Sequence, residues 1–256
     1  MQSIGPEQIG IAIGYFVPVE LQRRQFHLEP VLTELVRRSF KPLADSEFQQ
    51  VQPWCKWRAI TTYLDCLAFA DRAANGLPKG AQLSLEHVTP GQFYSAGAIF
   101  FAQAMIDNIA VWLCEAHDLQ VSGGERNFLK KKFTWQLIGK HAQAEDLMAT
   151  HSDFLEEVNR YRQVWIHTLA GGVIPIADGD PFSNPLVAKF LGVPIDPAIN
   201  IDETSYARRI EQCATRNQGR YLYPLGEFTK RVFDGGKRFY LDWLRFSLDT
   251  IIVSSD

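Results

Sequence analysis

The sequence predicts an all-α fold, an antiparallel helical bundle with an N-terminal helical extension. Apolar residues recur at helical spacing over most of the 256 residues. Hydrophobic residues make up 46% of the chain and include 17 Phe, 8 Tyr and 6 Trp, enough for a sizeable core. Period-two alternation, which indicates a short strand or extended segment, covers residues 8–18, and few other stretches are credible strands.

The N-terminal extension is expected to cover residues 1–90. Its two helices are predicted from apolar residues at helical spacing, and Gly76 is the expected stop of the second helix. Three Gly and two Pro predict the loop that follows. In chain order, the expected elements are a segment at 8–18, a helix at 19–40, a connector at 41–53, a helix at 54–75 and a loop at 76–92.

The bundle is expected to cover residues 91–256. Between its helices, residues 171–202 are rich in Gly and Pro and predict a loop with one short helix at 185–191. The last helix has a candidate bend at Gly235–Gly236. The expected bundle helices are 92–119, 124–150 as one helix or two, 151–169, 203–217 and 224–252.

Composition narrows the functional classes. The net charge of −3 provides no whole-molecule basic field, so any RNA contact requires a local patch. The first residues lack the pattern of a signal peptide. The most apolar run, 96–113, contains the polar residues Gln103, Asp107 and Asn108, which favours a buried helix of a soluble protein over a membrane span. We therefore expect a cytoplasmic protein without a membrane partner. Four widely spaced cysteines fit reduced thiols better than disulfides: Cys55, Cys66, Cys114 and Cys213.

The stretch "NRYRQVWIHTLAGG", residues 159–172, contains the candidate chemistry. On a helix over 151–169, one face is apolar, and Arg162 lies near its edge. The apolar face comprises Phe154, Leu155, Val158, Tyr161 and Trp165. A polar line lies on the opposite face and comprises Glu156, Arg160, Gln163 and His167.

This polar line admits two interpretations. The ordinary histidine pKa of about 6.5 lets His167 exchange protons at neutral pH, and an Arg beside it can bind phosphate oxygens and offset transition-state charge. These groups suffice for metal-free RNA cleavage, in which a 2′-hydroxyl attacks the adjacent phosphorus. The alternative is a solvated helix face with a Glu156–Arg160 pair.

An upstream helix carries polar residues inside an apolar run. A buried, unpaired Asp is costly, so Asp107 requires a partner, and Arg162 is the candidate. The alternative is that Asp107 or Asn108 is simply exposed.

Taken together, these features resemble the HEPN superfamily of helical-bundle domains over about residues 93–252. The shared order is a long helix with Asp107 and Asn108, a connecting helix with Lys and Arg, and a helix ending in Arg-x4–6-His. The resemblance implies a fold in which many members are metal-independent endoribonucleases of toxin–antitoxin, abortive-infection or CRISPR systems. Other members are non-catalytic RNA-binding or scaffold versions.

The resemblance also implies roles for particular residues. The catalytic His falls on His167, and the catalytic Arg falls on Arg162 or Arg160, with four or six residues between. Gln163 occupies the position after Arg162, where the family commonly has Asn. In the family, two protomers usually juxtapose their motifs, so a homodimer is expected.

Three functions stay open at this point. The first is a metal-independent endoribonuclease of a prokaryotic defence or toxin–antitoxin system, with Gln163, Asp107 and Asn108 as substrate-binding candidates. The second is a non-catalytic HEPN-like scaffold that binds RNA or a protein partner, such as an antitoxin. The third is an unrelated bundle with its own small-molecule pocket. No metal or cofactor is expected, because the chain lacks the di-iron, zinc-protease and nucleotide-binding motifs.

Overall fold

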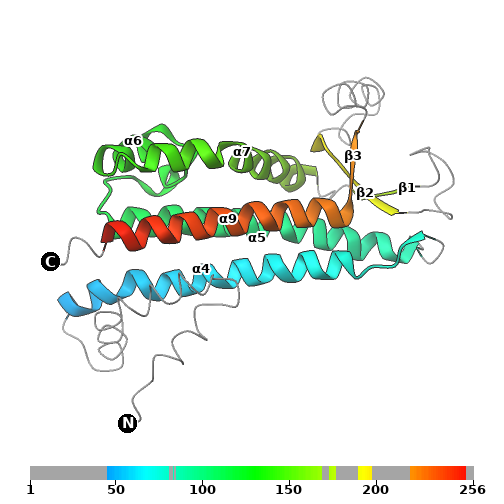
Figure 1. Cartoon of the computed structure of the whole chain (residues 1–256), viewed down its shortest axis with the longest axis horizontal. Coiled ribbons are helices and arrows are strands. Elements are labelled where there is room, and N and C mark those ends of the chain that lie inside the picture. The colour runs from blue at the N-terminus through cyan, green and yellow to red at the C-terminus, as the bar shows by residue number, and fades with distance from the viewer. Residues whose placement is uncertain are drawn as a thin grey trace, which may run out of the picture. The chain divides into compact units, whose positions relative to one another are not determined.

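A computed structural model of the chain describes residues 45–80, 83, 85–168, 173–176, 190–197 and 220–251. Most of these residues are helical, which confirms the all-α prediction at this level (Figure 1). The elements are α4 (Asp45–Asn75), a 3₁₀ turn (Leu85–His87), α5 (Val88–Ala116), a second 3₁₀ turn (Gly123–Glu125), α6 (Lys131–Lys140), α7 (Ala144–Thr168), β1 (Ile174–Ile176), β2 (Phe190–Pro194), β3 (Leu222–Pro224) and α9 (Leu225–Ile251).

The predicted helices exist where the structure describes them, with shifted ends. The stretch 124–150 forms two elements, because α6 ends at Lys140 and α7 begins at Ala144. Helix α9 is continuous through Gly235–Gly236. Gly76 follows the end of α4 as predicted, and its N–H donates to the carbonyl oxygen of Arg72 at 3.0 Å.

The connector expected at 41–53 was wrong for residues 45–53, which form the first part of α4. The sequence there offers Asp45, Ser46 and Glu47, residue types that favour a helix start. Pro53 removes one backbone donor and its ring crowds the carbonyl of residue 49, yet the 31-residue helix continues through it.

Three expected elements lie outside the described residues: the segment at 8–18 and the helices at 19–40 and 203–217. The division into an extension at 1–90 and a bundle at 91–256 therefore stays a prediction.

The chain forms two compact units. The first unit contains Ala104–Ser152 with the described residues before Cys66 and after Gly236. The second unit contains Cys66–Gln103 and, with gaps, Asp153–Gly236. Each of the four long helices contributes residues to both units.

The core of the first unit is aromatic. The ring of Phe128 lies 4.9 Å from that of Trp243 and 5.1 Å from those of Phe133 and Phe239. Trp243, Phe133 and Phe239 are fully buried. Such clusters contribute apolar burial together with favourable edge-to-face geometry.

In the second unit, α9 runs antiparallel to both α4 and α7. Asp71 of α4 contacts Thr229 of α9, and Asn75, further along α4, lies next to Gly226, which comes earlier in α9. On another side of α9, Glu157 binds Arg231 with oxygens 3.0 and 3.1 Å from Nε. The ring of Phe154 lies over Gly235, where a Cβ would come within 2.5 Å of it.

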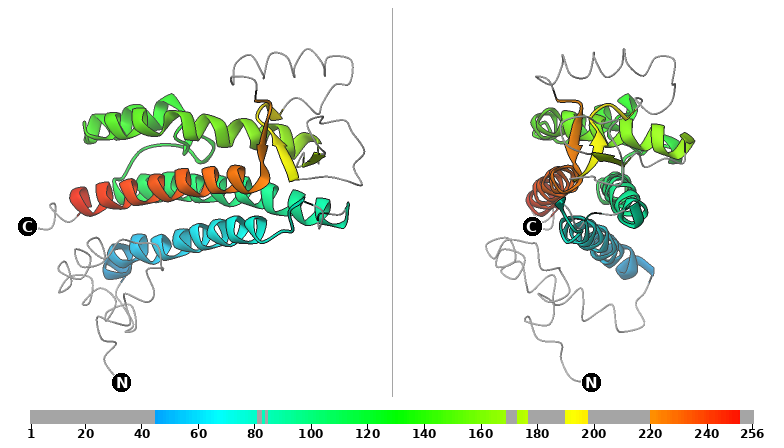
Figure 2. Two further views of the ribbon diagram at one scale, coloured as in Figure 1. Left: turned by 45° about the vertical axis from the view of Figure 1, so that its right-hand side comes forward. Right: turned by 90° about the vertical axis from the view of Figure 1, so that its right-hand side faces the viewer.

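Three short antiparallel strands, in the order β1-β2-β3, complete the second unit. Gly192 of β2 pairs with Ile174 on one side and with Pro224 on the other. Figure 2 shows β2 beside β3, which leads directly into α9. The short helix expected at 185–191 was therefore wrong for residues 190–191, because Gly192 and Pro194 disfavour helix there.

Helix α5 is long and apolar enough to cross a membrane by length and composition, although 61% of its most apolar 18-residue window is buried inside the protein. A buried core helix satisfies the same criteria. Gly91 lies in the first turn of this helix, where a Cβ would meet Leu191 at 2.8 Å, so α5 approaches β2 closely at this point.

Candidate functional site

The predicted motif lies at the end of α7. Residues 160–163 lie in this helix, and His167 is in its last turn, one residue before Thr168. The side chain of His167 lies outside the described part of the chain. The apolar face is confirmed, because Val158 and Tyr161 are fully buried and the rest of it is buried or half-buried.

Hydrogen bonds attach this part of α7 to the end of β2. The buried hydroxyl of Tyr161 lies 2.6 Å from the carbonyl oxygen of Pro194 and 3.0 Å from that of Ile195. Arg160 donates from a guanidinium nitrogen to the same carbonyl oxygen of Ile195 at 3.2 Å. Two adjacent side chains of the motif thus hold one backbone segment.

The two candidate arginines lack carboxylate partners among the described residues. Arg160 is exposed, and its guanidinium lies 5.8 Å from the ring centre of Tyr161. Arg162 is half-buried and forms no ion pair with any described residue. The Glu156–Arg160 pair of the alternative interpretation is not among the ion pairs of the described residues. By contrast, Arg231 of α9 is neutralised by Glu157.

Gln163 is exposed on the same face of α7. Its amide nitrogen lies 3.5 Å from the side-chain oxygen of Asn159, at the limit of a hydrogen bond. Glu156 and Arg160 are exposed as well, so the predicted polar line is confirmed for its described side chains. This face of the helix is accessible to a ligand.

Asp107 and Asn108 belong to the first unit, whereas residues 160–163 belong to the second. Asp107 accepts a hydrogen bond from the amide of Asn127 at 3.0 Å, so Asn127 is a partner that the sequence did not indicate. Asn108 is exposed, and its amide donates to the carbonyl oxygen of Ala104 at 2.7 Å. Both residues therefore have local structural roles.

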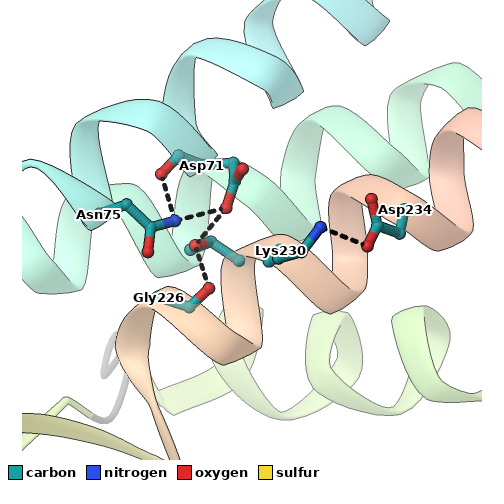
Figure 3. A network of polar contacts seen from close by, with 6 residues as sticks. Asp71, Asn75, Gly226, Lys230 and Asp234 are labelled. Carbon is teal, nitrogen blue, oxygen red and sulfur yellow. Dashed lines mark hydrogen bonds and ion pairs between the residues drawn. The ribbon is translucent and has the colours of Figure 1, made fainter.

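A polar network of the second unit was not predicted (Figure 3). The hydroxyl of Thr229 donates to the carboxylate of Asp71 at 3.0 Å, and the amide of Asn75 donates to the same oxygen at 2.9 Å. Burial raises the pKa of Asp71. Beside it on α9, Lys230 pairs with Asp234 at 2.8 Å. The Thr229 bond joins the end of α4 to the beginning of α9, and the Asn75 bond, within α4, orients the Asp71 carboxylate.

A cleft of about 320 Å³ lies next to this network. Its walls are mostly apolar, with Lys79 and Glu227 among the polar residues. Glu227 also lies 3.7 Å from Arg220. The lining residues are Ala74, Asn75, Leu77, Pro78, Lys79, Leu191, Pro224, Leu225, Gly226 and Glu227.

Two histidines of the first unit form a pair that the sequence did not predict. Nε2 of His141 lies 3.0 Å from Nδ1 of His117, and Phe246 packs against both rings. Lys140 donates to the carbonyl oxygens of His117 and Asp118, just beyond the end of α5. Nε2 of His117 is buried with no hydrogen-bond partner among the described residues.

No family model matches the sequence, and no curated protein or solved structure matches it. The site is therefore interpreted from its own chemistry. Within the described ranges, no group of three or more His, Cys, Asp and Glu side chains is placed to hold a metal ion. The α7 site offers the exposed guanidinium of Arg160 and the half-buried guanidinium of Arg162, followed along the helix by a histidine.

Acid is expected to destabilise the protein through His117. Burial, with the nearby charges of His141 and Lys140, lowers the pKa of His117 from 6.5 to about 4. Below pH 6.5 the unfolded chain binds a proton at His117 that the folded chain does not bind. The contribution of neutral His117 to the free energy of unfolding is therefore complete above pH 6.5. It falls by about 1.4 kcal/mol per pH unit as the pH drops toward 4, about 3 kcal/mol in all.

Denaturant unfolding of the wild type and of His117→Asn at several pH values tests this dependence. Asn keeps a polar atom near the position of Nδ1 but does not titrate. The stability of the variant should fall less steeply between pH 6.5 and 4. Equal slopes for the two proteins would contradict a buried, neutral His117.

Proposed function

We propose that the protein is a metal-independent endoribonuclease of the HEPN type, acting in a prokaryotic defence or toxin–antitoxin system. One observation supports this function most. Arg160 and Arg162 have no carboxylate partner among the described residues and precede His167 by seven and five positions on α7. A guanidinium group without a carboxylate partner is suited to bind a phosphodiester.

The reaction needs one proton acceptor and one positive group at the phosphate. His167 takes the proton of the 2′-hydroxyl while that oxygen attacks the adjacent phosphorus. The bond to the 5′-oxygen breaks, and this leaving oxygen takes up a proton. The products are a 2′,3′-cyclic phosphate end and a 5′-hydroxyl end. An arginine stabilises the negative charge that grows on the phosphoryl oxygens.

The two arginines are expected to differ. Arg160 is already held by the carbonyl of Ile195, whereas Arg162 has no described partner and matches the spacing that the family commonly has. Arg162→Ala is therefore expected to lower RNA cleavage by about 10²–10³-fold, and Arg160→Ala by less. Gln163 would contact RNA beside them.

Cleavage of total RNA in excess chelator by each variant measures this difference. Arg72→Ala is the matched control, because Arg72 is an exposed helical arginine of the same unit without a described ion pair. Its activity should equal that of the wild type. If all three variants cleave RNA like the wild type, the arginines bind no phosphate.

A non-catalytic scaffold is the second candidate function. The exposed aromatic side chains of α5 favour it, because Phe93 is 67% and Phe100 is 44% exposed. Exposed apolar patches mark surfaces that bind other molecules. A protein that binds RNA or a protein partner such as an antitoxin, without cleaving RNA, would have this function.

A further inference from the structure

The outer face of α6 presents an exposed tryptophan next to a lysine. Trp135 is 73% exposed, whereas Phe133 and Leu137 on the opposite face of the helix are fully buried. Positions four apart lie on one face of a helix, so Lys131 lies one turn before Trp135 and Gly139 one turn after it. Lys131 is exposed as well. An indole ring and an ammonium group are therefore neighbours on the same outer face.

The segment that contains this face is basic. Residues 126–140 include one Arg, four Lys and no Asp or Glu, in a chain whose net charge is −3. Lys130 and Lys131 are exposed and form no ion pair within the described part of the chain, whereas Lys132 pairs with Glu125 at 3.2 Å. The chain has no overall basic field, so a local patch of this kind is what a polyanion would require.

The lysines lie at an unfavourable end of the helix. Lys130 precedes α6, Lys131 and Lys132 are its first residues, and its first turn has no acidic residue. The dipole of a helix places partial positive charge at the N-terminus, where acidic side chains stabilise the helix and basic ones do not. An anion bound by these lysines would relieve the repulsion.

Hydrogen bonds hold α6 in place. Gln136 donates to the carbonyl oxygen of Gln120 at 3.0 Å. Lys140, at the other end of α6, donates to the carbonyl oxygens of His117 and Asp118. The outer face thus has a fixed backbone before any ligand binds, which reduces the entropy lost on binding.

We infer that Lys130, Lys131 and Trp135, here called the α6 surface, bind single-stranded nucleic acid. One unpaired base stacks on the indole of Trp135, and the neighbouring phosphates contact the two lysines. Binding should depend little on sequence, because every base has a π-face. Paired bases inside a duplex are already stacked on each other, so single strands should bind more tightly than duplexes.

The apolar content of the α6 surface favours nucleic acid over a membrane. Helices that lie on membranes insert an apolar face into the lipid. In α6 this face, with Phe133 and Leu137, is buried inside the protein. Among the described residues of the first unit, Trp135 and Leu129 are the large apolar side chains that remain exposed. Two such groups provide little area for insertion.

The inference does not rest on the proposed cleavage chemistry. The α6 surface belongs to the first unit, whereas Arg160 and Arg162 belong to the second. Single-stranded DNA lacks the 2′-hydroxyl that cleavage requires, so it measures binding alone. A chain that cleaves RNA but does not bind this DNA would contradict the inference and leave the ribonuclease proposal intact. DNA binding without RNA cleavage would have the opposite meaning.

Fluorescence anisotropy of a labelled single-stranded DNA of about 12 nucleotides tests the inference with the full chain. Trp135→Ala should raise the dissociation constant about 5–150-fold, as the loss of one stacked base does, and leave the salt dependence unchanged. Trp135→Phe keeps a ring and should lose less affinity. Replacing Lys130 and Lys131 with Gln should instead lower the slope of log K against log salt, by about 0.7 for each lost phosphate contact.

Two variants of the second unit are matched controls. Phe69 is a 59% exposed aromatic residue, and Lys79 is an exposed lysine, so Phe69→Ala and Lys79→Gln should bind the DNA like the wild type. Wild-type affinity in Trp135→Ala, or a wild type that does not bind the single strand at low salt, would overturn the inference. So would binding to phosphatidylserine vesicles through Trp135 in place of DNA.

Discussion

Replacing His167 with alanine is expected to slow RNA cleavage by about 10²–10⁴-fold, the contribution that positioned proton transfer typically makes. The position of His167 in the last turn of α7, after Arg160 and Arg162, is the basis for this expectation. Initial rates on a defined RNA in excess chelator measure the effect. Added imidazole should restore part of the activity to His167→Ala, because it can replace the missing proton acceptor.

His87→Ala is the control for this experiment. His87 is a half-exposed histidine of the same unit, in the first 3₁₀ turn, and has no place in the proposed site. Its removal should leave the cleavage rate unchanged. Equal losses for the two variants, or no rescue by imidazole, would indicate that His167 transfers no proton.

Replacing Trp243 with alanine is expected to lower the free energy of unfolding by about 3–5 kcal/mol, as large cavities in aromatic cores do. Trp243 is fully buried, and its ring centre lies 4.9 Å from that of Phe128 and 5.2 Å from that of Phe246. Guanidinium unfolding followed by circular dichroism measures the loss.

Two matched variants separate the loss of the buried aromatic ring from other effects of replacing a tryptophan. Trp243→Phe should cost much less, because it keeps an aromatic ring and removes an indole N–H that is buried without a hydrogen-bond partner among the described residues. Trp135→Ala removes a 73% exposed indole and should change stability by about 0.5 kcal/mol or less. A Trp243→Ala variant as stable as Trp135→Ala would contradict the described core.

The helices could be predicted because their signals are local. In α7, the spacing of Leu155, Val158, Tyr161 and Trp165 identified a face that the structure buries. The 3.6-residue period depends only on neighbouring positions along the chain. Gly76 after α4 was identified for the same reason.

Other parts of the fold depend on contacts between distant residues. The strand at Phe190–Pro194 forms because β1 and β3 pair with it. The local sequence pattern does not predict this pairing. Asn127, the partner of Asp107, and His141, the partner of His117, come from elements 20 and 24 residues away. Periodicity contains no information about such pairs.

The exposed face of the candidate site could be predicted from the sequence, but its contacts could not. The position of His167 near a helix end was predicted from the glycines at 171–172. The exposure of Arg160 and Gln163 was predicted from helix geometry. The bond from Arg160 to Ile195 could not be predicted, because the end of β2 is 35 residues away. That bond makes the two arginines distinguishable.

The chemical identity of the RNA ends tests the central claim most directly. Purified protein would be incubated with a defined RNA in excess chelator, beside His167→Ala prepared in the same way, and the new ends would be mapped. The proposed site predicts 2′,3′-cyclic phosphate and 5′-hydroxyl ends from the wild type alone. Intact RNA, or the same ends from both proteins, would contradict it and leave the end of α7 as a structural helix terminus.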